Sequence, residues 1–172
     1  MNRFTKGLAL ALTIFGFSTT NTFAQKTATA TAYATVVTPI AISRTADLNF
    51  GIFASGSTLG TVVVPISGPR TKTGGVVLPA GIITTVNPAG FTVTGQPSYN
   101  YSISFPSSTN TLSNGTTTMT LDTFVHSAGT TPQLNSSGTQ SFTVGATLNV
   151  AADQAAGDYV SQTPFVVQVV YN

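Results

Sequence analysis

The stretch from Ser141 to Val150 reads Ser-Phe-Thr-Val-Gly-Ala-Thr-Leu-Asn-Val, with an apolar residue at every second position. Successive side chains of a β-strand point to opposite faces, so this period of two indicates a strand with one buried face. This is the clearest alternation in the chain. The apolar face consists of Phe142, Val144, Ala146, Leu148 and Val150.

Residues typical of strands dominate the chain beyond residue 25, and good helix formers are scarce. Turn residues recur about every eight to twelve positions, which is typical of an all-β sandwich or barrel. We predict an all-β fold, an antiparallel two-sheet β-sandwich of immunoglobulin-like or pilin-like form, with a closed β-barrel as the alternative. The other expected strands cover residues 28–37, 40–42, 48–50, 61–66, 75–78, 82–86, 91–93, 99–105, 119–125 and 165–171.

Two of these strands carry further expectations. Tyr99 and Tyr101 share a face with the apolar residues of strand 99–105, so both are expected to be buried. Phe124 and Val125 continue strand 119–125 out of phase, which predicts a β-bulge there.

The N-terminus has the pattern of an export signal. Arg3 and Lys6 precede an almost wholly apolar run over residues 7–17, and small residues follow at the positions of a cleavage site. We predict a cleaved secretory signal peptide over residues 1–24 and a single domain over residues 25–172. The product is expected to be periplasmic, on the cell surface or extracellular. No later apolar run approaches the ~20 residues of a transmembrane helix.

An extended arm is predicted directly after the signal, over residues 27–37. Threonine or tyrosine alternates there with small apolar residues, which is the period of a β-strand. This arm is a candidate assembly strand, which pairs either within its own sheet or with another copy. Tyr33, on its polar face, is a candidate exposed contact. The inward face of the arm consists of Ala28, Ala30, Ala32, Ala34 and Val36.

Without the signal the chain carries no net charge, because four basic residues balance four aspartates and there is no glutamate. We therefore expect no nucleic-acid partner, and near-zero charge favours association with other copies. Cysteine is absent, so packing and ladder hydrogen bonds must hold the fold together. The charged residues are Lys26, Arg44, Arg70, Lys72, Asp47, Asp122, Asp153 and Asp158.

Residues suited to chemistry are few, and we predict no enzyme, no cofactor and no metal site. His126 is the single histidine and is expected to be exposed at a strand end or in a loop. Asp153 and Asp158 could ligate calcium, although capping of turns is the favoured interpretation. Arg70 and Lys72 are interpreted as the solvated tip of a hairpin, with a partner contact as the alternative.

Three segments resemble an exported bacterial family known only as domain-of-unknown-function family 4402. They are Ala46-Asp47-Leu48-Asn49-Phe50-Gly51, Gly145-Ala146-Thr147-Leu148, and the ending from Ala156 to Asn172. The resemblance spans nearly the whole chain after the signal. It implies export and a β-fold, and the family has no assigned activity.

A looser resemblance is to subunits of chaperone–usher pili and to spore-coat-U-like proteins, through the arm, the Thr-rich body and the final strand. That resemblance implies that the arm of one subunit completes the sheet of the next. We therefore expect a structural or adhesive surface protein, such as a fimbria-like subunit. The alternative is an exported binding module for glycan or another surface ligand. The candidate final strand carries Phe165, Val167, Val169 and Tyr171.

Overall fold

The computed structural model describes residues 24–172 of the chain. The expected signal peptide therefore lies outside the described residues, except for its last residue, Ala24. The chain divides into two units, one that ends at Thr35 and one that covers Val36–Asn172. Residues 24–172 contain strands and loops and no helix, so no helix there is long and apolar enough to cross a membrane. The predicted all-β class is confirmed.

Ten strands make up the unit from Val36 onward. Eight of them form one antiparallel sheet, in the order β1-β4-β8-β7-β6-β9, with β2 paired to β8 and β3 paired to β2. The other two, β5 and β10, form a second small sheet. The strands are β1 (Ala41–Ala46), β2 (Gly60–Val64), β3 (Thr71–Gly74), β4 (Ala89–Thr94), β5 (Tyr101–Ser104), β6 (Thr109–Ser113), β7 (Thr118–His126), β8 (Thr139–Val150), β9 (Val160–Ser161) and β10 (Gln168–Tyr171).

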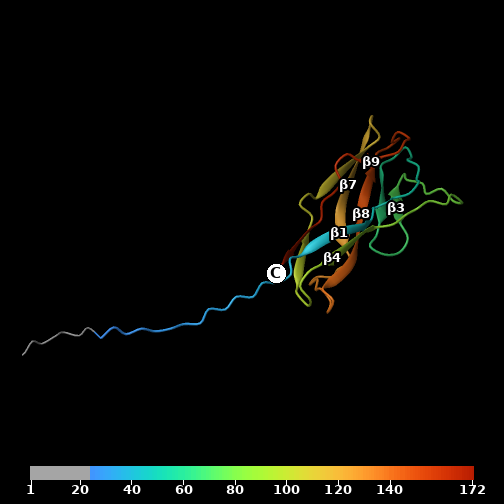
Figure 1. Ribbon diagram of the computed structural model, residues 1–172. Coiled ribbons are helices and arrows are strands. Elements are labelled where there is room, and N and C mark those ends of the chain that lie inside the picture. Colours follow the sequence, from blue (N-terminus) through green and yellow to red (C-terminus); the bar gives the residue numbers. More distant parts are fainter. Residues whose placement is uncertain (1–23) are drawn as a thin grey trace, which may run out of the picture. The chain divides into compact units, whose positions relative to one another are not determined.

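The alternation of residues 141–150 predicts a strand, and β8 forms there; the structure places it at the centre of the large sheet. It pairs with β7 along one edge, and with β4 and β2 in turn along the other edge. Figure 1 shows β8 in orange along the length of the unit. In the described chain, β1 pairs only with β4 and β9 only with β6, so the sheet does not close into the alternative barrel.

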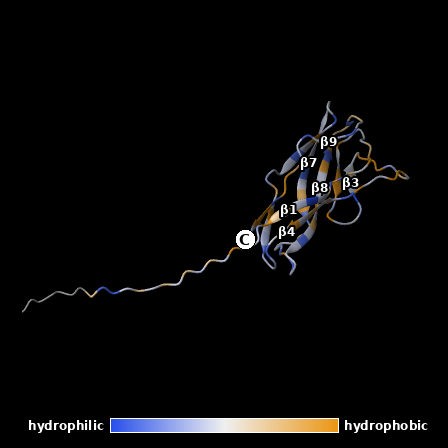
Figure 2. Ribbon diagram, in the orientation of Figure 1, coloured by the Kyte–Doolittle hydropathy of each residue, from blue (hydrophilic) through white to orange (hydrophobic). Residues whose placement is uncertain are grey.

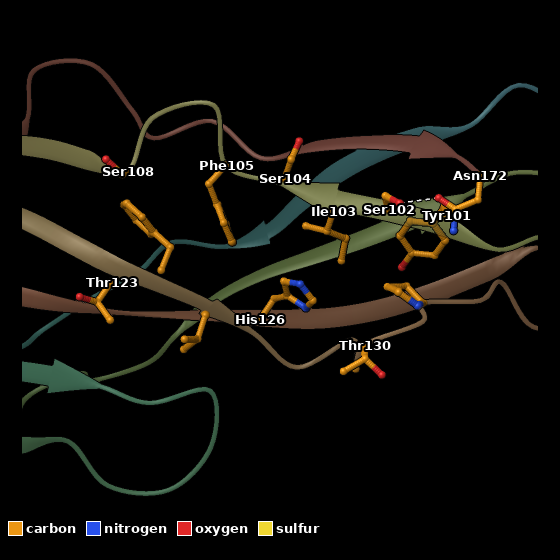
Figure 3. A pocket seen from close by; sticks show the side chains of 14 residues that line it. Tyr101, Ser102, Ile103, Ser104, Phe105, Ser108, Thr123, His126, Thr130 and Asn172 are labelled. Carbon is orange, nitrogen blue, oxygen red and sulfur yellow. Dashed lines mark hydrogen bonds between the residues drawn. The ribbon is translucent and has the colours of Figure 1, made fainter.

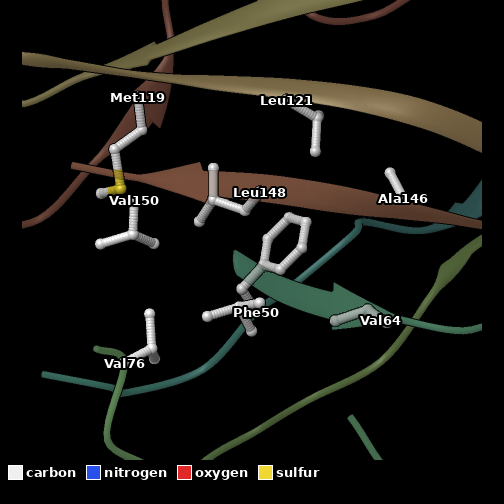
Figure 4. Close-up of a cluster of buried hydrophobic side chains, with 9 residues drawn as sticks. Phe50, Val64, Val76, Met119, Leu121, Ala146, Leu148 and Val150 are labelled. Atoms are coloured by element: carbon white, nitrogen blue, oxygen red, sulfur yellow. The ribbon is translucent and has the colours of Figure 1, made fainter. Parts of the chain in front are cut away.

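The apolar face of β8 contributes to two clusters of buried side chains. Phe142 and Val144 belong to one cluster, with Tyr101 and Val93. Ala146, Leu148 and Val150 belong to the other, which Figure 4 shows. Figure 2 shows hydrophobic and hydrophilic residues alternating along the strands, which is the pattern that separates core from surface. The remaining members of the second cluster are Phe50, Val62, Val64, Val76, Met119 and Leu121.

The predicted bulge is present in β7. Its register against β8 shifts between Asp122 and Val125, and Thr123 has a positive φ of 51°. The tyrosine prediction is half right, because Tyr101 is fully buried whereas Tyr99 is 42% exposed. Tyr99 precedes β5 and packs edge-on against Tyr171 at the end of the core.

Several predicted strands are wrong. Residues 75–78 and 48–50 form only single bridges, through Val77 and Asn49, and residues 82–86 form no strand. Pro79 and Gly81 interrupt this region, and Ile83 is fully exposed, so the run lacks a neighbour to pair with. Strands β3, β6 and β9 have no apolar alternation of their own, and each forms by pairing to an existing edge.

Candidate functional site

The N-terminal arm is not a strand in this structure. None of residues 24–40 belongs to a strand, so the strand expected over residues 27–37 does not form within the chain. A strand needs a neighbour for its backbone hydrogen bonds, and these residues have none among the described strands. The side chains of residues 24–36 are exposed, including Tyr33 at 91% and Val36 at 96%. The other members of the inward face, Ala28, Ala30, Ala32 and Ala34, are exposed as well.

The end of the arm is held by a small hydrogen-bond cluster. The Tyr171 hydroxyl donates to the Thr38 carbonyl at 2.7 Å and accepts the Gln96 backbone N–H at 2.6 Å. The Thr38 N–H in turn donates to the Gln96 side-chain oxygen at 3.0 Å. A Cβ at Gly95 would overlap this hydroxyl, so the missing side chain makes room for the contact. The point from which the arm starts is therefore fixed to the sandwich.

The C-terminal segment has the alternating face that the sequence predicts, although β10 is shorter than expected. Phe165, Val167, Val169 and Tyr171 are half-buried and pack on the same cluster as Phe142. Among the described strands, β10 pairs only with β5, so its other edge is open. Beside that edge lies a groove of about 450 Å³, which Ile40 and Ile42 line from the β1 side.

A second and larger groove, of about 910 Å³, lies between β5 and the end of β7. Ile103 and Phe105 from the β5 side and His126 from β7 point into it, as Figure 3 shows. Phe105 also stacks on Phe124, with ring centroids 5.4 Å apart. Burial raises the pKa of the Tyr101 hydroxyl, which bonds Gln140 at 2.9 Å. We call this space the β5–β7 groove.

His126 is not the exposed residue that the sequence suggested. It is the last residue of β7 and is half-buried, with its ring 6.3 Å from that of Phe105 and 6.2 Å from that of Phe142. Its Nδ1 is buried and has no hydrogen-bond partner in the described unit. The sequence holds a signal for this burial, because Phe124 and His126 are two residues apart and so share one face of the strand beyond the bulge.

Arg70 and Lys72 lie beyond the tip of the hairpin that joins β2 to β3, and only Lys72 is exposed as expected. Residues Thr71–Gly74 form β3, and the Arg70 guanidinium donates to the carbonyls of Phe50 and Ile52. The second of these bonds is 2.7 Å long. Arg70 therefore holds the segment that carries the family-like motif, where the Asn49 side chain also accepts the Gly51 N–H at 2.8 Å.

That motif and the segment before β9 line one cavity of about 990 Å³. Its walls come from residues 48–55, 83–85 and 154–159. Tyr159 is bonded there to the Gln154 side chain at 2.8 Å and to the Ala155 carbonyl at 2.8 Å. Leu48 and Tyr159 both pack against the buried cluster that contains Phe50, so the two resembling segments share one part of the core.

The aspartates considered for calcium lie apart from other ligands. Asp153 has a positive φ of 48°, and its N–H donates to the Gly56 carbonyl at 2.8 Å. Asp158 is exposed. No group of three or more histidines, cysteines, aspartates or glutamates that could hold a metal occurs in residues 24–172.

Comparisons with known proteins give one match. No match to a curated protein or to a solved structure was found. A family model covers residues 40–171, which includes every strand described above and excludes the arm. The chain therefore belongs to the family described as Domain of unknown function (DUF4402).

Proposed function

We propose that this protein is an exported, non-enzymatic structural protein of the cell surface, whose copies join when the arm of one adds a strand to the sandwich of another. The observation that carries the proposal is the arm itself. It is an exposed segment with a period of two, and it starts from a point that Tyr171 and Thr38 fix beside open strand edges. An open edge is a template for a further strand.

The chemistry of the arm suits this role. From Thr27 to Val37 it has no charged side chain, so no buried charge opposes its insertion into a neutral sandwich. Its alanines are small, and apolar burial contributes only about 25 cal/mol per Å². The affinity must therefore come mainly from backbone hydrogen bonds, each of which contributes about 0.5–1.5 kcal/mol net.

Export and a fimbria-like role are parts of the same proposal. The basic and apolar N-terminus supports export, and the absence of cysteine means that assembly needs no oxidation step. The resemblance to pilus subunits supports assembly by strand addition. The chain departs from those subunits in having no cysteine for their usual disulfide.

The experiment deletes residues 27–35 and compares the product with that of the full chain, each expressed with its own N-terminus. We expect the full chain to form oligomers by light scattering, and the deletion to stay monomeric with an unchanged β-sheet circular dichroism spectrum. N-terminal sequencing is expected to begin at Gln25. Persistent oligomers after deletion, or loss of folding, would overturn the role of the arm.

A matched pair of point variants isolates backbone pairing. Thr31→Pro removes an N–H from the arm, so the arm can no longer pair on both sides, whereas Thr31→Val, on the face opposite the alanines, keeps the N–H and favours strands. We expect the proline variant to lose oligomers and the valine variant to keep them. Equal behaviour of the two would contradict strand addition.

A further inference from the structure

We infer that the acceptor for the arm is the β5–β7 groove of a second copy. This inference rests on the proposed function and names the surface that performs it. The occupant is the alternating part of the arm, from Ala28 to Val36, inserted as an extended strand between β5 and the last residues of β7. It would join the small sheet to the large one.

Both walls of this groove have backbone groups available for a ladder. β6 pairs with β7 only as far as Asp122, so Val125 and His126 are paired to β8 alone among the described strands. On the other wall, β5 pairs with β10, and the Tyr101 N–H points the opposite way, to the Pro132 carbonyl. Because alternate residues of a strand direct their backbone groups to the same side, the Ile103 N–H and C=O face the groove.

The size of the groove matches a strand. One residue of an inserted strand occupies about 160 Å³, which is the product of the spacing between strands, the spacing between sheets and the rise per residue. The β5–β7 groove of about 910 Å³ therefore has room for roughly five or six of the nine residues from Ala28 to Val36, and the others lie beyond its ends. The groove beside β10, at about 450 Å³, has room for roughly three.

One polar atom in the β5–β7 groove lacks a partner. The Nδ1 of His126 is buried without a hydrogen bond, and leaving such an atom unpaired costs about 1–3 kcal/mol. An inserted strand carries N–H and C=O groups at regular intervals, and the arm adds threonine hydroxyls. Nδ1 is closed to the groove in the present position of the ring, so it bonds the inserted strand once the ring turns, in either protonation form.

The lining of the groove selects an uncharged, extended occupant. It has no lysine, arginine, aspartate or glutamate, so it offers no counter-charge to a phosphate or a carboxylate. Its floor is apolar, through Ile103, Phe105 and Phe124. Phe105 and Phe124 stack on each other at this floor, with ring centroids 5.4 Å apart, so small side chains suit the occupant best. Alanine at alternate positions meets that requirement.

The bulge in β7 is a second observation that favours a binding edge beside the groove. Thr123 lines the groove with a φ of 51°, a left-handed conformation that is uncommon for a threonine. Backbone strain of this kind concentrates at binding sites, and bulges re-aim side chains beside them. Here the bulge restores Phe124 and His126 to the groove face.

The test is site-directed disulfide formation between copies, in a chain that has no native cysteine. One set of variants places cysteine on the outer face of the arm, as Thr29→Cys, Thr31→Cys and Thr35→Cys. Each is mixed with Val125→Cys, on the outer face of β7, under mild oxidation. The matched control is Val170→Cys on β10, which is exposed at 61% against 46% for Val125.

We expect one arm position to give a covalent dimer with Val125→Cys in at least tenfold excess over Val170→Cys, with the joined peptides identified by mass spectrometry. Facing side chains of adjacent strands fall within disulfide range. Oligomers that crosslink mainly through Val170→Cys, or through neither site, would overturn the β5–β7 assignment and leave arm-driven assembly intact. A full chain that forms no arm-dependent oligomer would overturn both proposals.

Discussion

Replacing Tyr171 with phenylalanine tests the contact that holds the base of the arm. The substitution removes one hydroxyl, which donates to the Thr38 carbonyl and accepts the Gln96 N–H. The ring and its edge-on contact with Tyr99 remain. Any loss of stability can therefore be assigned to these two hydrogen bonds.

The size of the effect follows from the exposure of the two partners. A typical intramolecular hydrogen bond contributes about 0.5–1.5 kcal/mol. Thr38 is exposed and its carbonyl can bond water, whereas Gln96 is half-buried. We expect the free energy of unfolding to fall by about 1–2 kcal/mol, and the melting temperature by about 3–6 °C for a domain of this size.

The assay is urea unfolding followed by far-ultraviolet circular dichroism. We expect a lower midpoint with an unchanged slope, since the surface exposed on unfolding does not change. The control is Tyr33→Phe in the arm, where the side chain is 91% exposed and the stability should stay the same. A loss equal to that of the control would refute the reasoning, because the cluster would then contribute nothing.

Two further substitutions test interactions that the sequence did not reveal. Arg70→Met should lower the free energy of unfolding by about 2–3 kcal/mol, because it removes two charge-assisted bonds to carbonyls, while Lys72→Met, on an exposed position of β3, should stay within about 0.5 kcal/mol. Similar losses from the two would contradict the role of the guanidinium. Burial raises the pKa of Tyr101 above 10.0, so the folded state keeps its proton where the unfolded state has lost it. Stability should therefore be constant in this respect below about pH 10 and fall as the pH rises through the folded pKa. Tyr101→Phe should remove the part of the stability loss above pH 10 that comes from this hydroxyl. At pH 7 it should lower the free energy of unfolding by about 1 kcal/mol, because the bond to Gln140 is lost. Urea unfolding at pH 7 and above pH 10 measures both effects.

The local pattern of the chain predicts strands that bury one face. β8 forms where residues 141–150 alternate, and β2, β4 and β5 form near their expected positions. The bulge in β7 is visible in the sequence too, because a change of phase between Leu121 and Phe124 cannot occur in a regular strand. Each of these features depends on neighbouring residues alone.

Strands and contacts that depend on a distant partner could not be predicted. The sequence from Pro69 to Gly75 looks like a turn, yet β3 forms there because the edge of β2 is available. Arg70 looks solvated, yet it binds carbonyls about twenty residues earlier in the chain. His126 lies at a strand end, and only the tertiary structure places its ring beside those of Phe105, which follows β5, and Phe142 of β8.

The sequence by itself determined the all-β class, the strand over residues 141–150, the alternating faces and the period of the arm, because these follow from the orientation of successive side chains along the backbone. The tertiary structure decided which strand edges stay open and that Tyr171 bonds Thr38 at the end of the arm. It also decided that the Nδ1 of His126 has no hydrogen-bond partner. These properties depend on hydrogen bonds and packing between segments far apart in the chain, and no local pattern encodes which segments become neighbours.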